Sequence, residues 1–173
     1  SAGVVTAVAN GTSWVVAEAG GVRDSALVTV DQAVASVSTT PAGATLTSLG
    51  ETIQVDANIL DSGGTPVSGA AASWSSTSQG VATVSSSGLV TAVANGTTKI
   101  IAEEDGKSDT TAITVSQTVA TVTVTPSAAT LTSKVDSVQL TASATDALGN
   151  PVAGAPFTWG TTPTTNVVTV SST

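Results

Sequence analysis

The sequence contains one structural unit twice. The seven residues Thr6–Thr12 recur unchanged as Thr91–Thr97, an offset of 85 residues. The same offset aligns residues 1–80 with residues 86–165 without a gap, and one inserted residue near Pro163 then restores the register. Because a repeat of this length is typical of stacked copies of one module, the sequence predicts a tandem array of a single fold.

Short alternating segments separated by turn signals fill one period of the repeat. Asp61–Pro66 supplies glycines and a proline, and the dipeptide Asn95–Gly96 favours a tight hairpin turn. The Val, Ile and Thr residues between such turns favour strands. We therefore expect eight strands, a number that is typical of two packed antiparallel sheets. Their expected positions are Val34–Ser38, Ala44–Thr47, Thr52–Leu60, Ala71–Ser75, Val81–Val84, Gly88–Val93, Thr97–Glu103 and Thr110–Val115.

The repeat divides the chain into three parts. Residues 33–117 are expected to form a complete domain, residues 1–32 the C-terminal part of a preceding repeat, and residues 118–173 the N-terminal part of a further repeat. The expected fold class is all-β, with tandem β-sandwiches repeating every 85 residues.

The period-2 alternation predicts which side chains fill the sandwich. Trp74 and Trp159 occupy equivalent positions on a strand that should cross its centre, where a large ring fills the space between the sheets. The other residues predicted inside are Val55, Val84, Leu89, Ile100 and Val115.

A third tryptophan, Trp14, is expected on the surface. Its equivalent in the next repeat is Lys99, and a position that accepts lysine should face solvent. Trp14 is therefore a candidate interface residue, although single exposed apolar side chains are also common without any partner.

The composition excludes most catalytic and binding chemistry. The chain has no His and no Cys, which removes the usual zinc ligands, thiol nucleophiles and the side chain that titrates near neutrality. We therefore predict no enzyme activity, no catalytic residues, no metal and no cofactor. The net charge of −8, with only four basic residues, argues against a nucleic-acid partner, and no apolar run is long enough for membrane insertion.

Two weaker site hypotheses come from local motifs. Glu103–Asp109 concentrates carboxylates in one hairpin and could hold calcium, but it lacks a spaced ligand pattern, so a solvated acidic turn is the preferred interpretation. Asn10 and Asn95 each begin an Asn-Gly-Thr acceptor pattern for glycosylation, although a hairpin turn explains them equally.

The order of short motifs along one period resembles that of the bacterial immunoglobulin-like domains of group 2. The resemblance covers the whole chain, and the segments that carry it are Val122–Pro126, Ala129–Thr132, Asp146–Ala155, Trp74–Ser76, Val81–Val93 and Ile113–Val115. The chain departs from the family pattern at Asp61–Pro66 and at Gly160, both in or beside loops.

The resemblance implies an immunoglobulin-like sandwich and, more loosely, a role. Such domains are links in the stalks of intimin-type and invasin-type adhesins, and they also occur in surface-layer, secreted and phage tail proteins. The first function hypothesis is thus a non-catalytic stalk or spacer of an extracellular or cell-surface protein. Its expected partners are neighbouring repeats of the same protein, in cis or in trans. Abundant Ser and Thr without Cys suit a bacterial extracellular location.

The alternative hypothesis is an assembling module of an extracellular filament, a phage tail or a decoration protein. Residues 3–30 should supply the last three strands of a sandwich, and residues 118–173 should supply its early strands. Because either part alone exposes unpaired strand edges and half a core, we expect one to complete the other, either in a continuous array or by strand complementation between separate chains.

Overall fold

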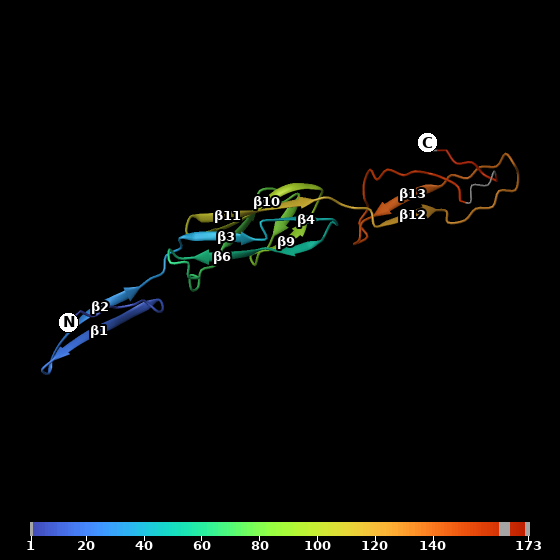
Figure 1. The fold of residues 1–173 in the computed structure, drawn as a ribbon. Coiled ribbons are helices and arrows are strands. Elements are labelled where there is room, and N and C mark those ends of the chain that lie inside the picture. Colours follow the sequence, from blue (N-terminus) through green and yellow to red (C-terminus); the bar gives the residue numbers. More distant parts are fainter. Residues whose placement is uncertain (1, 163–166, 172–173) are drawn as a thin grey trace.

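The computed structural model describes residues 2–162 and 167–171 and is an elongated, all-β molecule (Figure 1). The insertion expected near Pro163 lies outside these residues. The strands are β1 (Gly11–Ala19), β2 (Val22–Val30), β3 (Ser36–Thr40), β4 (Gly43–Leu46), β5 (Thr52–Gln54), β6 (Asp56–Leu60), β7 (Ser73–Ser76), β8 (Ala82–Val84), β9 (Leu89–Ala92), β10 (Gly96–Glu104), β11 (Lys107–Val115), β12 (Thr121–Thr125) and β13 (Thr141–Thr145).

Strands β3 to β11 form a sandwich in the middle of the molecule, with β1 and β2 at one end and β12 and β13 at the other (Figure 1). One sheet has the order β4-β11-β10-β7. Its centre is the hairpin of β10 and β11, whose tight turn places Asp105 and Gly106 at positive φ. Strand β4 pairs in parallel with β11, and β7 pairs antiparallel with β10.

The opposite layer consists of two small sheets, one of β3 paired with β6 and one with β9 between β5 and β8. Val55 alone separates β5 from β6, and its backbone N–H donates to the carbonyl oxygen of Gly88 at 3.0 Å. Gly88 has a φ of +81°, and a Cβ atom there would lie only 2.2 Å from the carbonyl oxygen of Val55. The close approach of these two segments therefore requires glycine at position 88.

The sandwich core lies between these sheets in two connected clusters. The larger contains Leu46, Val55, Ala82, Val90, Ala92, Ile100, Ile113 and Val115. The smaller contains Val37, Ile59 and Ala102. Trp74 is half-buried and packs against both clusters, so its ring connects them.

All eight expected strands are present, and their boundaries lie within three residues of the expected positions. The strand expected at Thr52–Leu60 is interrupted at Val55 and forms β5 and β6. The prediction of an all-β sandwich is confirmed. Val55, Ile100 and Val115 are buried, whereas Val84, Trp74 and Trp159 are half-buried.

The placement of Leu89 in the core is wrong. Its side chain is 40% exposed, and the neighbouring Val90 is fully buried instead. Successive side chains of a strand point to opposite faces, so a shift of one residue in the assumed phase reverses which of them is inside. The pairing of Val90 with Ile53 and Val84 fixes the phase of β9.

The two ends of the molecule repeat the local geometry of the centre. Hairpin β1–β2 pairs Gly11 with Val30, as β10–β11 pairs Gly96 with Val115, and the registers agree along the whole hairpin. Likewise, β12–β13 has the register of β3–β6. Residues 3–8 form no strand, although three strands were expected in residues 3–30. A strand there would need sheet partners like the β5 and β8 that flank β9 in the central sandwich.

We predict that Gly88→Ala destabilises the central sandwich much more than Gly64→Ala. Both glycines have positive φ, but a Cβ at Gly64 meets nothing within 4 Å. The backbone conformation alone should cost about 1–2 kcal/mol, and the clash with Val55 should add about 1–3 kcal/mol at Gly88. Urea denaturation followed by circular dichroism measures both, and equal unfolding midpoints for the two variants would contradict the close approach.

We also predict that Trp74→Ala lowers the free energy of unfolding by about 3 kcal/mol, because it removes the ring that connects the two core clusters. The matched control is Trp14→Ala, which removes a side chain that is 63% exposed and should change stability by less than about 0.5 kcal/mol. Calorimetry of both variants checks this, and similar losses would show that Trp74 does not support the core.

Candidate functional site: the junctions between units

A network of side-chain hydrogen bonds between distant segments lies where the central sandwich meets the following part of the chain. We call this network the C-terminal junction and define it by Leu49, Asn95, Gln117, Asp146 and Asn150. Leu49 follows β4, Asn95 precedes β10, and Gln117 follows β11, while Asp146 and Asn150 follow β13. The junction thus collects residues from both units.

Gln117 connects the two units through its backbone and its side chain. Its backbone N–H donates to Oδ1 of Asn95 at 2.8 Å, and Nδ2 of Asn95 donates to Oε1 of Gln117 at 3.3 Å. On the other side, Nε2 of Gln117 donates to Oδ2 of Asp146 at 3.0 Å and to the carbonyl oxygen of Pro151 at 3.3 Å. A glutamine amide can do this because it is both a donor and an acceptor.

Asp146 connects the units a second time. Its Oδ2 atom accepts from the backbone N–H of Leu49 at 2.9 Å, and Nδ2 of Asn150 donates to the carbonyl oxygen of Leu49 at 2.8 Å. Its Oδ1 atom accepts from the backbone N–H groups of Leu148 and Asn150 at 3.0 and 2.9 Å, which closes its own turn. The residue is only 2% exposed.

These bonds favour the ionised carboxylate. Burial opposes the ionisation of Asp146, but the hydrogen bond from Gln117 and those from three backbone N–H groups outweigh it. Together they hold the pKa of Asp146 well below its ordinary value. A buried negative charge that is fully hydrogen-bonded therefore lies at the contact between the units.

The connecting backbone is itself tied down on both sides. The N–H groups of Ser116 and Thr118 donate to the carbonyl oxygens of Leu46 and Thr47 in the central sandwich, at 2.9 and 3.0 Å. The N–H of Ala120 donates to Thr145 of the next unit at 2.8 Å. One residue separates the two anchored segments, so the connection allows little bending.

A similar network lies before the central sandwich. We call it the N-terminal junction and define it by Asn10, Gln32, Asp61 and Ser68. The backbone N–H of Gln32 donates to Oδ1 of Asn10 at 2.9 Å, and its Nε2 atom donates to Oδ2 of Asp61 at 2.9 Å. Each of Asn10, Gln32 and Asp61 precedes its counterpart in the C-terminal junction by 85 residues. In both junctions the glutamine therefore donates to the asparagine and to the aspartate. Oε1 of Gln32 accepts from the backbone N–H of Ser68 at 3.4 Å, whereas Oε1 of Gln117 accepts from Asn95.

The junction residues carry no distinctive motif in the sequence. Asn10 and Asn95 resemble hairpin turns or glycosylation sites, and Asp61 resembles part of a turn. Asp146 begins a segment of the family pattern, while Gln32 and Gln117 belong to no motif. A usable signal was present, because the Asn, Gln and Asp positions all recur at the repeat offset of 85. Glycosylation stays an untested hypothesis, and at Asn95 the nitrogen that would carry sugar donates to Gln117.

The acidic hairpin Glu103–Asp109 has a structural contact at its end. Oδ2 of Asp109 accepts from the backbone N–H and the hydroxyl of Thr39, at 2.7 and 2.9 Å, which lowers the pKa of Asp109 and joins the two sheets. Within residues 2–162 and 167–171, no group of three or more His, Cys, Asp or Glu side chains could hold a metal ion.

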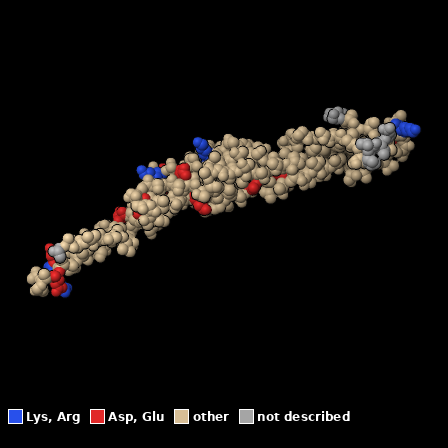
Figure 2. Space-filling model, viewed as in Figure 1, with Lys and Arg blue, Asp and Glu red and all other residues tan. Residues whose placement is uncertain are grey.

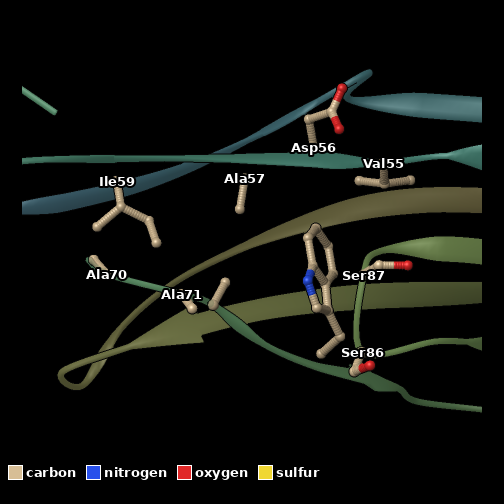
Figure 3. A pocket seen from close by; sticks show the side chains of 10 residues that line it. Val55, Asp56, Ala57, Ile59, Ala70, Ala71, Ser86 and Ser87 are labelled. Carbon is tan, nitrogen blue, oxygen red and sulfur yellow. The ribbon is translucent and has the colours of Figure 1, made fainter. Parts of the chain in front are cut away.

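An open hollow of about 250 Å³ lies beside the central core (Figure 3). Val55, Asp56, Ala57 and Ile59 line one side, with the Ala70–Ala72 segment, Trp74, Ser86 and Ser87 around them. Figure 3 shows the side chains of Val55, Ala57 and Ile59 facing this space, with Asp56 pointing away from it. Alanines and two serines form much of its wall, and Asp56 is the only ionisable residue among those that line it.

Charged side chains are sparse on the molecular surface. Figure 2 shows Lys and Arg as separate points along the visible face, most of which is uncharged. Trp14, the candidate interface residue, lies on β1 opposite Leu27 and is 63% exposed. In the part of the chain that the structure describes, no helix is long and apolar enough to cross a membrane.

Comparison with known proteins gives one family match and several similar structures. Residues 33–115 match the family model of the bacterial Ig-like domain (group 2). Domains 1-6 of the surface layer protein SbsC align at 24% identity and a TM-score of 0.49, over 84% of this chain and 21% of that one. The Escherichia coli adhesin FdeC aligns at 24% identity and a TM-score of 0.48, over 83% and 53%.

This chain thus spans about a fifth of the length of the SbsC fragment and about half of the FdeC chain. The search of curated proteins found no match.

We predict that the contact between Leu49 and Asp146 withstands acid. Because its pKa is lowered, Asp146 stabilises the junction fully above its ordinary pKa of about 4, and this stabilisation is lost only as the pH falls toward the lower folded value. The amide resonance of Leu49 in NMR spectra should therefore stay constant through pH 4 and move at lower pH. In Asp146→Asn the transition should vanish. A midpoint near pH 4 in the unmodified chain would contradict this assignment.

Proposed function

Because residues 33–115 match the family model of the bacterial Ig-like domain (group 2), we propose that this chain is a non-catalytic spacer in the stalk or array of an extracellular or cell-surface protein. Its task in that role is to hold neighbouring domains at a fixed distance and orientation. The chemistry of the chain supports this role, since it has no His or Cys and few charged side chains. We also propose the division into residues 1–32, 33–117 and 118–173.

The observation that carries the proposal is the double connection across the C-terminal junction. Gln117 bonds to Asn95 on one side and to Asp146 on the other, while Asp146 and Asn150 both bond to Leu49. Contacts between domains joined by flexible linkers allow relative motion, whereas a short linker anchored on both sides restricts it. This arrangement is suited to a stiff spacer.

The N-terminal junction supports the same role by its repetition. The bonds from Gln32 to Asn10 and Asp61 have nearly the same lengths as those from Gln117 to Asn95 and Asp146. A junction that recurs with the domain would give each successive unit the same orientation. The result would be a regular rod rather than a flexible string of domains.

A second candidate function is an assembling module of a filament, phage tail or decoration protein. Exposed apolar residues on the first hairpin and on β12 favour it, among them Val15 and Val122. Such residues lie in the core when a sandwich is complete. The two candidates are compatible, because a stiff unit can also assemble.

We predict a narrow distance distribution across the C-terminal junction. The chain has no cysteine, so spin labels can be attached at Thr83→Cys and Thr123→Cys, two exposed positions on β8 and β12. Pulsed electron resonance should give a sharp distribution that broadens in Asp146→Ala, which loses the bonds to Leu49 and Gln117. Asp61→Ala removes the equivalent carboxylate from the N-terminal junction and should leave this distribution sharp. A broad distribution in the unmodified chain would contradict a stiff spacer.

A further inference from the structure

The dipeptide Asn95–Gly96, where β10 begins, combines two groups that can react with each other. The side-chain carbonyl carbon of an asparagine can be attacked by the backbone nitrogen of the next residue, which closes a succinimide ring. Glycine hinders this attack least, because it has no side chain beside the nitrogen and few restrictions on its backbone. Asn95 is exposed, so water has access to the site. Sequence and exposure therefore make this asparagine chemically labile.

The fold requires glycine at position 96. Its φ is +147°, and a Cβ atom there would lie 3.0 Å from Cγ2 of Val81. The segment before it is anchored to the same residue, because the backbone N–H groups of Val93 and Ala94 donate to the carbonyl oxygen of Val81 at 2.8 and 3.2 Å. A larger residue at position 96 would disturb this packing, so the labile pair cannot be removed by replacing the glycine without cost to the sandwich.

Gln117 restrains the labile side chain. Oδ1 of Asn95 accepts from the backbone N–H of Gln117 at 2.8 Å, and Nδ2 of Asn95 donates to Oε1 of Gln117 at 3.3 Å. Ring closure needs the asparagine side chain to rotate until its carbonyl carbon meets the nitrogen of Gly96. A side chain that is hydrogen-bonded at both terminal atoms has little freedom for this rotation. Opening of the C-terminal junction should therefore set the rate of the reaction.

We propose that Asn95 is a site of spontaneous deamidation whose rate is controlled by the C-terminal junction. The nitrogen of Gly96 gives up its proton and forms a bond to Cγ of Asn95, while the bond from Cγ to Nδ2 breaks and ammonia leaves. Water then opens the succinimide ring and leaves a carboxylate, in an aspartate or an isoaspartate residue. The net reaction consumes one water molecule and releases one ammonia molecule, so the chain and its solvent supply every reactant.

The new carboxylate does not fit the hydrogen bonds of Gln117. The side-chain amide of Gln117 has one end that donates and one end that accepts. Its Nε2 atom donates to Asp146 and to the carbonyl oxygen of Pro151, which leaves Oε1 for the amide of Asn95. A carboxylate at position 95 has no proton to give to Oε1, and turning the amide of Gln117 over would place Oε1 against Asp146. Deamidation therefore removes a hydrogen bond and adds a negative charge beside the junction.

This inference rests on the proposed spacer function, because it gives the junction between two units a chemical lifetime. Acid loosens the junction reversibly through Asp146, whereas deamidation loosens it permanently, since the ammonia is lost to the solvent. An isoaspartate product also lengthens the backbone between Ala94 and Gly96. The stiffness of the spacer should therefore decrease with age.

The C-terminal junction contains an internal control. Asn150 belongs to the same network, and its Nδ2 atom donates to the carbonyl oxygen of Leu49 at 2.8 Å. The next residue is Pro151, whose ring nitrogen bears no proton and cannot close the same ring. We therefore expect Asn95 to convert and Asn150 to keep its amide under identical conditions.

The test follows both asparagines in the whole chain during incubation at mildly alkaline pH. Trypsin cuts after lysine and arginine, which places Asn95 in the peptide of residues 24–99 and Asn150 in that of residues 135–173. Mass spectrometry of these peptides distinguishes an amide from a carboxyl group, and fragmentation locates the change. The same chain in urea gives the rate of the unrestrained dipeptide, and we expect slower conversion in the folded chain.

A matched pair of variants tests the control by the junction. Gln117→Ala removes the bond to Nδ2 of Asn95 and should accelerate conversion about fivefold, the factor that corresponds to a hydrogen bond of about 1 kcal/mol. Gln32→Ala makes the same substitution in the N-terminal junction and should leave the rate at Asn95 unchanged. Two results would overturn the proposal. One is an Asn95 that keeps its amide in the folded chain, and the other is an equal rate with and without Gln117.

The spin labels at Thr83→Cys and Thr123→Cys test the consequence for stiffness. Asn95→Asp introduces the product and should broaden the distance distribution, whereas Asn10→Asp adds the same charge at the N-terminal junction and should leave it sharp. A sharp distribution in Asn95→Asp would overturn the predicted loosening and leave the spacer proposal standing. A broad distribution in the unmodified chain would contradict the spacer proposal, while the conversion rates of Asn95 would still decide whether the junction controls deamidation.

Discussion

The sandwich core depends on two sets of side chains that come from different stretches of the repeat. Strands β9, β10 and β11 contribute Val90, Ala92, Ile100, Ile113 and Val115, and the earlier strands contribute Leu46, Val55 and Ala82. Neither set buries itself without the other, because each belongs largely to one face of one layer. The central part of the chain holds both sets and forms a closed core.

The junctions are subject to a different constraint, because a small contact area must fix the orientation of two neighbouring units. Apolar packing has little directional preference, but hydrogen bonds to a carboxylate and an amide do. The carboxylate of Asp146 offers about four acceptor sites, to which the side-chain amide of Gln117, the backbone N–H of Leu49 and backbone N–H groups of its own turn donate. The carboxylate of Asp146 stays ionised because these hydrogen bonds offset the cost of its burial. Since only one residue separates Thr118 from Ala120, the connecting chain keeps the two units in this arrangement.

The sequence predicted the fold well because alternation and repetition are local signals. It placed every strand of the central sandwich, but it put Leu89 rather than Val90 in the core, since the phase of a four-residue strand depends on its partners. The junction escaped prediction for a related reason. Gln117 and Asp146 are 29 residues apart, and each looks like an ordinary loop residue until the fold brings them together. In the sequence, Gln117 and Asp146 are distinguished only by the recurrence of Gln and Asp at the repeat offset of 85, as Gln32 and Asp61.

The two kinds of contact should respond differently to the surroundings. The junction depends on a carboxylate, so its stability is tied to pH, while salt affects it little because the charge is buried and hydrogen-bonded. The sandwich core depends on apolar burial, which has no titrating group in its two clusters and which sulfate or phosphate strengthens. Acid that protonates Asp146 would therefore loosen the orientation of neighbouring units and leave the core of the central sandwich intact. The units would stay folded and connected after the stiffness between them had been lost.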